Sequence, residues 1–263
     1  MIDLNVTLEK IVKIVKDASN LFLDDFTIEE KGTITNIVTT NDINVQHYLI
    51  SHLKEVLPEA GFLCEEEDYF DHTSYEYVFV IDPIDGTENY SRGIQNCAIS
   101  VGLTYKRETI IGVVYSRYSG ELFTATKGGG AFLNGKPIHV SKRKFNESLL
   151  STAWSAYDKS KTLMINECLM DLIFRVKDFR RFGSAACEIS YVAMGRTDMF
   201  FEHKLSIWDF TAASLILTEA GGVIRGFDGP LDFSTKSMIM VANNEENLTE
   251  LSDTVHKYIK TFE

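Results

Sequence analysis

Residues 80–87, with the sequence VIDPIDGT, limit the folds open to this chain more than any other stretch. They continue an apolar run over residues 77–81 that is typical of a buried strand. Pro83 lacks an amide hydrogen and disfavours helix at the residue before it. We therefore predict that the strand breaks at Pro83 in a sharp turn and that a helix begins near Gly86 and Thr87.

The two aspartates of this stretch, Asp82 and Asp85, then crowd the carboxyl end of one strand. Two carboxylates held close together repel each other unless a cation lies between them. Together with the carbonyl of Ile84 they offer only oxygen ligands, which is the set that a hard cation such as Mg²⁺ prefers. An Asp-Gly pair is also a common turn, and a turn without a metal is the alternative interpretation.

Two other acidic groups follow or begin hydrophobic elements and favour the metal interpretation. Glu65 and Glu66 come directly after the short apolar strand expected at residues 61–64, whereas the next two acids fit a solvated face. Asp209 stands at the head of an apolar, alanine-rich helical segment, where its side chain could instead be an N-cap.

These motifs resemble those of the inositol monophosphatase family of Mg²⁺-dependent, Li⁺-sensitive phosphatases. The matching stretches are residues 38–42 (VTTND), 64–66 (CEE), 82–87 (DPIDGT), 208–209 (WD) and 219–222 (EAGG), within a likeness that extends over residues 30–245. The sequence departs from the usual family residues at Cys64, Glu88, Tyr90, Thr211 and Ala213. None of these is an expected metal ligand, so the departures bear on substrate preference.

The resemblance implies a fold of the α/β class with mixed α+β parts, a layered αβαβα sandwich of the inositol monophosphatase and fructose-1,6-bisphosphatase type. The hydrophobic pattern agrees with mixed layers. Residues 98–125 contain three strand-like runs separated by turns, which indicates an antiparallel meander. After a polar stretch at residues 141–146, strand-like and helix-like segments alternate. We expect an N-terminal lobe, residues 1–145, with most metal ligands, and a C-terminal lobe, residues 146–263, with substrate-binding elements and Asp209.

The resemblance also implies two or three Mg²⁺ ions per subunit. The first would be held near the hydroxyl of Thr87 and the second would share Asp82 with it as a bridging ligand. The oxygen donors implied for these two ions are Glu65, Asp82, Ile84 through its carbonyl, Asp85 and Asp209.

Four residues are implied to take part in catalysis: Thr87, Asp42, Glu65 and Glu66. Thr87, hydrogen-bonded to Asp42, would orient the attacking water and help to remove its proton. Glu66 would assist a third, weaker metal. From the residues alone, Asp42 could simply lie in the first turn of a helix that begins near Thr40, where the helix dipole favours a carboxylate.

The expected substrate-binding residues are Gly86, Thr87, Gly183, Ser184, Ala185, Glu202 and Asp209. The amides of Gly86 and Thr87 begin a helix and would hold phosphate oxygens. Residues 183–185 lie between a strand and a helix, where free amides could receive a substrate oxygen or small side chains could permit close packing. By the resemblance, Glu202 would accept hydrogen bonds from ring hydroxyls; otherwise it is a solvated carboxylate at the end of a strand.

Two further features have simpler interpretations. Lys31 lies in a polar, turn-rich stretch at residues 29–36 that we expect to be a loop or a loose hairpin, and a solvated lysine is favoured over one that approaches a bound phosphate. Residues 128–130 (GGG) lack the Gly-Lys-Ser/Thr ending and the following helix of a nucleotide phosphate loop. A Mg²⁺-dependent kinase or nucleotidase is therefore not expected.

Charge and composition limit the partners. A net charge of −12 argues against nucleic acid and anionic membranes, because both need basic surface to displace counterions. Divalent ions would reverse the local field for a phosphate substrate. The four cysteines are scattered and are read as reduced thiols. No apolar run approaches the length of a membrane span, so we expect a cytoplasmic protein, and the resemblance implies a homodimer.

The function expected from these observations is a phosphomonoesterase for a small phosphorylated polyol such as myo-inositol monophosphate. Fructose 1,6-bisphosphate, the 2′-phosphate of NADP(H) and 3′-phosphoadenosine 5′-phosphate remain as alternative substrates. A metal-binding regulatory protein without activity is the alternative class, but it would not need the pair of Thr87 and Asp42.

Overall fold

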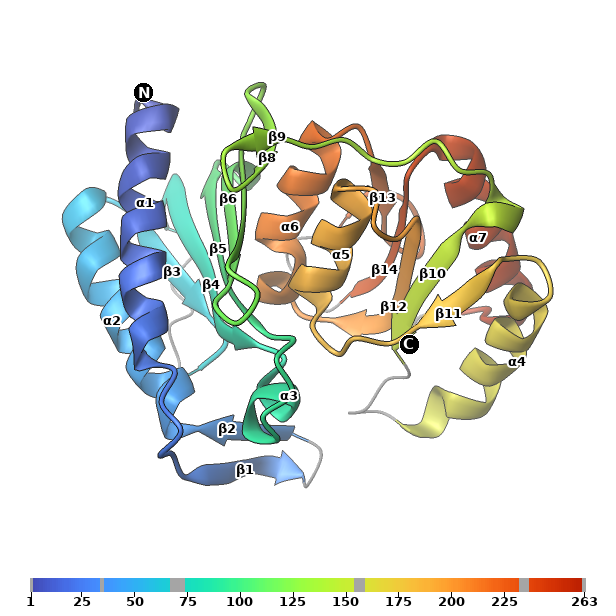
Figure 1. The fold of residues 1–263 in the computed structure, drawn as a ribbon, viewed down its shortest axis with the longest axis horizontal. Helices are drawn as coiled ribbons and strands as arrows, with labels where there is room; N and C mark the ends of the chain where they lie inside the picture. Colours follow the sequence, from blue (N-terminus) through green and yellow to red (C-terminus); the bar gives the residue numbers. More distant parts are fainter. Residues whose placement is uncertain (1, 34–35, 67–73, 154–158, 232–236, 262–263) are drawn as a thin grey trace.

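The chain folds into five alternating layers of helices and sheets. The computed structural model describes residues 2–33, 36–66, 74–153, 159–231 and 237–261. Figure 1 shows helices outside a large sheet, between that sheet and a smaller one, and outside the smaller sheet. In that order they are α1 (Leu4–Ala18) with α2 (Thr40–Val56), α5 (Ala185–Ala193) with α6 (Ile207–Glu219), and α4 (Thr162–Ile173) with α7 (Glu245–Tyr258). The predicted αβαβα sandwich is confirmed.

The large sheet has seven strands in sequential order. They are β3 (Gly61–Cys64), β4 (Tyr77–Asp85), β5 (Ala98–Tyr105), β6 (Glu108–Ser116), β7 (Glu121–Thr126), β8 (Gly130–Leu133) and β9 (Lys136–Pro137). β3 and β4 are parallel, and every later pair is antiparallel. The predicted meander is therefore present, and Asn134-Gly135 forms the turn between the last two strands.

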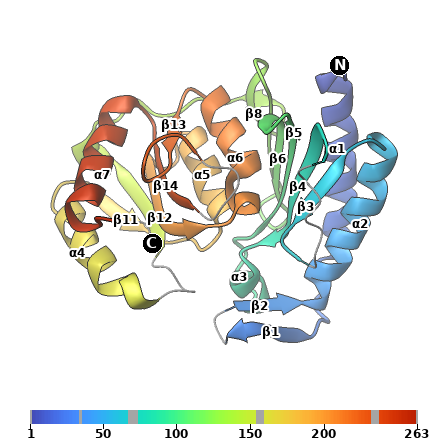
Figure 2. The same ribbon diagram turned by 180° about the vertical axis from the view of Figure 1, so that it is seen from behind.

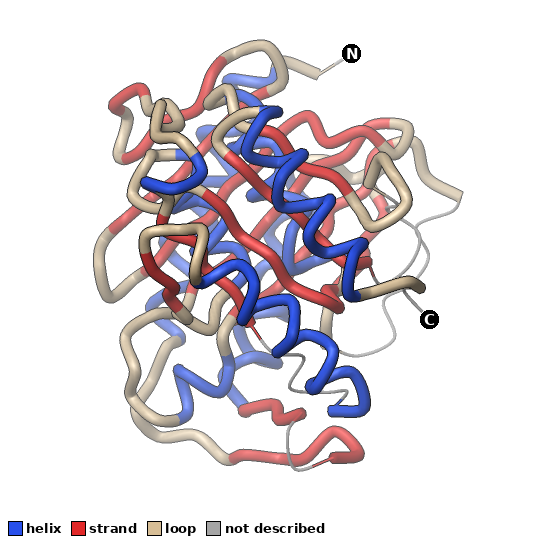
Figure 3. Tube along the Cα trace, turned by 90° about the vertical axis from the view of Figure 1, so that its right-hand side faces the viewer, coloured by secondary structure: helices blue, strands red, loops and turns tan. Residues whose placement is uncertain are grey.

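The smaller sheet has five strands in the order β11-β10-β12-β14-β13. They are β10 (Leu149–Ala153), β11 (Asp178–Arg180), β12 (Met199–Leu205), β13 (Val223–Arg225) and β14 (Ser237–Ala242). Figure 2 shows this sheet from behind, and Figure 3 shows α4 and α7 in front of its strands. β10 pairs in parallel with both of its neighbours, so crossover helices connect them, as the alternating pattern predicts.

α6 joins the two sheets into one body. It is buried along nearly its whole length, and Phe210 packs in the same apolar cluster as Phe200 of β12 and Phe123 of β7. Two glycines let the helix approach the large sheet closely. A Cβ added at Gly112 would lie 2.4 Å from the carbonyl oxygen of Ala212, and one at Gly102 would lie 2.6 Å from Thr211 Cγ2. This close packing brings the first turn of α6 to the end of β4.

The remaining elements are small. The stretch expected to be a loop or a loose hairpin forms a hairpin of β1 (Ile28–Thr33) and β2 (Asn36–Thr39), which lies beside α3 (Thr87–Ser91) in Figure 1. Single turns of 3₁₀ helix occupy Ser19–Leu21, Phe145–Glu147 and Lys159–Lys161. All four cysteines are buried and free. Within the described ranges, the helices lack the length and apolar character that a membrane crossing requires.

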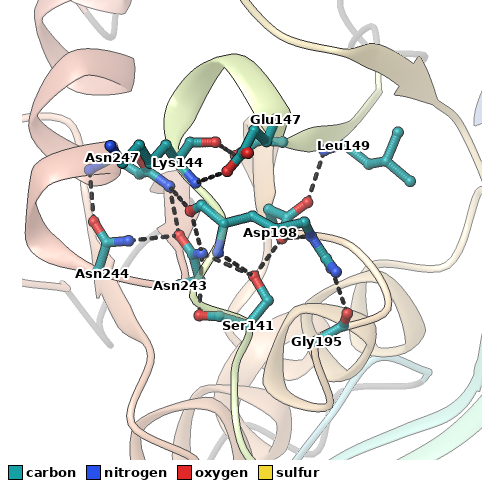
Figure 4. A network of polar contacts seen from close by, with 11 residues as sticks. Ser141, Lys144, Glu147, Leu149, Gly195, Asp198, Asn243, Asn244 and Asn247 are labelled. Carbon is teal, nitrogen blue, oxygen red and sulfur yellow. Dashed lines mark hydrogen bonds and ion pairs between the residues drawn. The ribbon is translucent and has the colours of Figure 1, made fainter.

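A network of polar contacts fastens the chain after the large sheet to the smaller sheet (Figure 4). The fully buried carboxylate of Asp198 accepts hydrogen bonds from the hydroxyl of Ser141, from Arg143 Nε at 2.8 Å and from the amide of Leu149 at 2.8 Å. Asn243 Nδ2 donates to Ser141 Oγ at 2.9 Å. The polar stretch at residues 141–146 is therefore an ordered connection that begins the second sheet.

Candidate active site

The strand predicted to break at Pro83 continues to Asp85, and this prediction was wrong. Asp82 pairs with Ser100 and Asp85 pairs with Ala98, so three steps along β4 face two steps along β5. This extra residue is a β-bulge. Side chains three apart on a regular strand face opposite sides of the sheet. The bulge turns the side chain of Asp85 to the same side of the sheet as that of Asp82, and both aspartates consequently line the same cavity.

Three carboxylates from distant parts of the chain meet at the end of β4. Glu65 follows β3, Asp82 belongs to β4 and Asp209 lies in the first turn of α6, and one carboxylate oxygen of each lies within 4.8 Å of the others. Burial, followed by the nearby charge of Glu65, raises the pKa of Asp82 well above its usual value. Burial and Glu65 raise the pKa of Asp209 in the same way. Such a cluster needs a cation for all three groups to be ionised together.

Asp209 serves the helix as well as this cluster. The N-cap of α6 is Ser206, so the predicted alternative of Asp209 as the N-cap was wrong. Its carboxylate instead accepts a hydrogen bond from the amide of Ser206 at 2.7 Å in a capping box. This contact fixes the side chain with one oxygen toward Glu65 and Asp82.

Asp85 lines the cavity but is not in the cluster of three. It accepts hydrogen bonds from the hydroxyl of Ser184, from the amide of Ala185 at 3.3 Å and from the amide of Ala186 at 2.8 Å. The amide of Gly183 donates to Glu188 at 2.8 Å. Of the amides that we expected either to receive a substrate oxygen or to lie in a closely packed segment, those of Gly183 and Ala185, like that of Ala186, thus donate to the protein's own carboxylates. Residues 183–185 do line the cavity, and their role in substrate binding stays a prediction.

Thr87 and Asp42 form the hydrogen bond that the resemblance implied. Thr87 Oγ1 lies 3.0 Å from Asp42 Oδ1 and 3.0 Å from the carbonyl oxygen of Ile84. Asp42 is also the third residue of α2, where it completes a capping box with Thr39. Asp42 thus caps α2 and contacts Thr87 at the same time. Burial raises the pKa of Asp42 to about 6, against the lowering effect of the Thr39 hydrogen bonds.

Lys31 is not the solvated lysine that we favoured. Its ammonium lies 2.5 Å from the carboxylate of Glu66 and 3.6 Å from that of Glu65, and 26% of its side chain is exposed. Burial and the charge of Glu65 raise the pKa of Glu66 to about 7, although Lys31 acts in the opposite direction. The hairpin β1–β2 thus brings a cation to the acidic edge of the site. The two acids after Glu66 lie outside the described residues.

The cavity at this site has a volume of about 460 Å³ and is bounded by both sheets. Besides the three clustered carboxylates, its lining includes Ile84, Asp85, Gly86, Thr87, Asn89, Arg181, Gly183, Ser184, Ala185 and Glu202. Gly86 precedes α3 with φ of 93°, a left-handed conformation that favours glycine.

Glu202 lies within β12 and not at its end as predicted, because this strand extends to Leu205. The side chain is half-buried. Burial and the neighbouring charge of Glu188 raise the pKa of Glu202 to about 8.

The sequence did not single out Asn89, Arg181 or Glu188 as functional residues. Asn89 lies in α3 two residues after the DGT motif, and Glu188 lies in the first turn of α5 after residues 183–185. Position near a motif was the only signal available for these two; the contact of Asn89 with Phe182 spans 93 residues, whereas Glu188 contacts residues five and six positions before it. The triple glycine at residues 128–130 behaves as expected: its amides at Gly128 and Gly130 donate to the carboxylate of Glu219 at 2.6 and 2.8 Å.

Comparison with known proteins agrees with this arrangement. A sequence model of the inositol monophosphatase family matches residues 2–260. The chain belongs to that family. The match covers nearly all of it, including every residue of the cavity. Family and fold together identify a phosphatase-type enzyme of a Mg²⁺-dependent family.

Three similar proteins illustrate the family. An inositol monophosphatase from Dictyostelium discoideum is 37% identical over 233 residues, which cover 85% of each chain. A Nus factor SuhB from Xylella fastidiosa (strain Temecula1 / ATCC 700964) is 35% identical over 209 residues, or 77% of this chain and 75% of the relative. The crystal structure of the extragenic suppressor protein suhB from Bartonella henselae is 30% identical with a TM-score of 0.90, covering 97% of this chain and all of that one.

The residues present fit Mg²⁺. The donors of the acidic cluster are carboxylate oxygens only, and Mg²⁺ is usually held by carboxylates and water. Burial first, and then repulsion by the charges of Glu65 and Asp85, raise the pKa values of Asp82 and Asp209. A divalent ion removes that repulsion.

Proposed function

We propose that this protein is a phosphomonoesterase that uses two or three Mg²⁺ ions and water to hydrolyse a small phosphorylated polyol such as myo-inositol monophosphate. One observation carries the proposal. Thr87, which is hydrogen-bonded to Asp42, lines the same cavity as the carboxylates of Glu65, Asp82 and Asp209. A binding protein needs the carboxylates, but it has no use for an oriented hydroxyl and a buried base beside them.

Bound Mg²⁺ would supply positive charge for the phosphate and acidify water in its coordination shell. The protein contributes orientation and a proton acceptor. When Thr87 Oγ1 donates to Asp42 Oδ1, its lone pairs are available to orient a water molecule in the cavity. Asp42 Oδ1 would receive the proton that passes through this hydroxyl. The pKa of Asp42, raised to about 6 by burial, suits a base near neutral pH.

The ligands that we propose for Mg²⁺ are the clustered carboxylates Glu65, Asp82 and Asp209, together with Asp85 and the carbonyl of Ile84. Glu66 would assist a weaker third ion. Lys31, 2.5 Å from Glu66, would have to leave that carboxylate first. No histidine, lysine or cysteine is among the described residues that line the cavity, which supports direct attack by water.

For the substrate, we propose that the amides of Gly86 and Thr87 at the beginning of α3 hold phosphate oxygens. The alcohol portion would lie between Gly183, Ser184 and Ala185 on one wall and Glu202 on another. Asp209 would lie at the junction of the metal and substrate portions. The net charge of −12 supports a small phosphorylated metabolite as the partner, rather than a nucleic acid or an anionic membrane.

Three coarser features belong to the same proposal. The first is a division into an N-terminal lobe, residues 1–145, and a C-terminal lobe, residues 146–263, with the substrate between them; lining residues from both ranges support it. The homodimer and the cytoplasmic location are carried over from the family resemblance. Size-exclusion chromatography with light scattering measures the oligomeric state directly.

Two crystal structures of one similar protein bear on the choice of substrate. SaIMPase-II, 26% identical to this chain, has one crystal structure described with inositol monophosphate bound and another with 2′AMP bound. An inositol phosphate and a nucleotide 2′-phosphate such as that of NADP(H) are thus both supported as candidates. Fructose 1,6-bisphosphate and 3′-phosphoadenosine 5′-phosphate complete the set.

A phosphate-release screen over these four compounds with purified protein tests the proposal. We expect Mg²⁺-dependent release from at least one of them, with the polyol phosphate preferred. Relatives named Nus factor make a role without hydrolysis the competing outcome. Absence of release from all four compounds and from an aryl phosphate, with Mg²⁺ present and the protein folded, would favour that outcome.

A further inference from the structure

A short loop from the smaller sheet is held against α3 of the large sheet from two sides. The loop, residues 181–184, follows β11 and leads into α5. On one side, Asn89 Nδ2 donates to the carbonyl oxygen of Phe182 at 2.6 Å and to that of Asn96 at 2.8 Å. On the other side, Glu188 Oε1 accepts the amides of Phe182 at 3.2 Å and Gly183 at 2.8 Å.

The chain at Gly86 and the loop at Gly183 approach so closely that neither position has room for a side chain. A Cβ added at Gly86 would lie 3.0 Å from the carbonyl oxygen of Gly183, and one at Gly183 would lie 3.0 Å from Asn89 Nδ2. Both glycines have positive φ, 93° and 79°. Any shift of the loop toward or away from α3 therefore changes the spacing between Gly86 and Gly183 in the cavity wall.

The buried end of this arrangement is Glu188. It is 1% exposed, and it accepts two backbone amides through a single oxygen. Burial raises the pKa of Glu188 to about 7, against the lowering effect of the hydrogen bonds from the loop amides. Tyr191, one helical turn later, donates to Asn96 Oδ1 at 2.8 Å and so ties α5 to the same residue that Asn89 contacts.

We propose that Asn89 and Glu188 are positioning residues that set the distance between the phosphate end and the alcohol end of the substrate cavity. Gly86 and Thr87 on α3 form the first end, and Gly183, Ser184 and Glu202 form the second. The two residues hold these ends together without reacting themselves. This inference rests on the proposed phosphatase function.

The test compares a cyclic polyol monophosphate with an aryl phosphate that has no hydroxyl groups. Glu188→Ala removes the acceptor of both loop amides. We expect kcat/KM for the polyol phosphate to fall about 10-fold, mainly through KM, because the loop no longer holds the alcohol end in place. We expect the aryl phosphate, which needs only the phosphate end, to change by less than about 2-fold.

Conservative variants and a control separate positioning from general damage. Glu188→Gln keeps one acceptor oxygen and should restore most of the lost kcat/KM. Asn89→Asp keeps the size but replaces the donor, so it should raise KM for the polyol phosphate as Glu188→Ala does. Asn5→Asp makes the same chemical change at an exposed position of α1 and should have no effect. Amide hydrogen exchange at Phe182 and Gly183 should accelerate in Glu188→Ala while exchange in β4 stays unchanged.

Three outcomes would overturn the positioning role of Asn89 and Glu188. Equal losses on both substrates, or failure of Glu188→Gln to restore activity, would assign Asn89 and Glu188 to general folding. No change on either substrate would show that the loop does not set the cavity. If Glu188→Ala does not fold, the kinetics of Asn89→Asp and amide exchange at Phe182 and Gly183 in that variant decide between the same outcomes. A wild-type protein inactive on both substrates would overturn the phosphatase proposal and this inference with it. If the wild type is active, and the variants lose equal activity on both substrates or none on either, only the inference is overturned.

Discussion

At the scale of single residues, Asp82 combines a cost to the fold with a benefit to the site. It lies between Glu65 and Asp209, and the three carboxylates are within 4.8 Å of one another. Asp82→Asn keeps the shape and removes one charge. Without metal we expect the free energy of unfolding to rise by on the order of 3 kcal/mol, at an effective dielectric of about 20, because this charge no longer repels its neighbours. With Mg²⁺ we expect turnover to fall at least about 10²-fold.

Two measurements check this prediction: urea unfolding in the presence of a chelator, and phosphate release with saturating Mg²⁺. Near wild-type turnover together with unchanged stability would mean that Asp82 is only a strand residue beside a turn.

Thr87 allows a test of chemistry apart from metal binding. Its hydroxyl lies 3.0 Å from Asp42, and its side chain is not needed for the carboxylate cluster. We expect Thr87→Ala to lower kcat about 10²-fold while the Mg²⁺ dissociation constant changes much less. Thr87→Ser, which keeps the hydroxyl, is the matched control and should retain most activity. Steady-state kinetics and calorimetric Mg²⁺ titration measure the two quantities. A loss confined to Mg²⁺ affinity would reassign Thr87 to the metal site.

At the scale of elements, the network around Asp198 connects the end of the large sheet to β10, β12 and β14. Asp198→Ala leaves Arg143 and the amide of Leu149 without their shared acceptor. Asp198 is fully buried although the Arg143 side chain is 42% exposed, and an amide left without its acceptor is costly, so we expect a loss of about 2 kcal/mol in the free energy of unfolding. Glu147→Ala changes an exposed carboxylate of the same connection and should cost less than about 1 kcal/mol. Urea unfolding of both variants gives the comparison, and equal, small losses would mean that the connection carries little stability.

The elements also show how far the sequence could be read. Helical spacing, turn residues and strand runs predicted the α2 helix, the meander and the alternating second half, because each depends on neighbours along the chain. The resemblance supplied the pairing of Thr87 with Asp42. Three features escaped: the bulge in β4, the ion pair of Lys31 with Glu66, and the contact of Asp85 with the beginning of α5. Each depends on a partner strand, hairpin or helix whose distance only the folded chain defines.

At the scale of the whole molecule, the chain carries 38 acidic and 26 basic side chains, and its cavity concentrates the acidic ones. A phosphate will not enter such a cavity unless divalent ions are bound. We therefore expect hydrolysis to be lost in excess chelator and restored by Mg²⁺. Lithium at tens of millimolar should inhibit, as the family resemblance implies. Phosphate release with and without each ion is the measurement. Hydrolysis that persists in chelator would contradict the metal-dependent reaction.

The bulge in β4 has a consequence for how such a gene can change over time. Asp82 and Asp85 face the same cavity only because β4 carries one residue more than β5 between them. Replacing Pro83 or Ile84 alters one side chain, but deleting either codon would turn one aspartate to the opposite face of the sheet while leaving both in the sequence. Pro83 and Ile84 are both buried, so descendants of this chain should accept other apolar residues between the two aspartates but almost no insertions or deletions. The number of residues between the two aspartates should therefore be inherited more strictly than the identities of those residues.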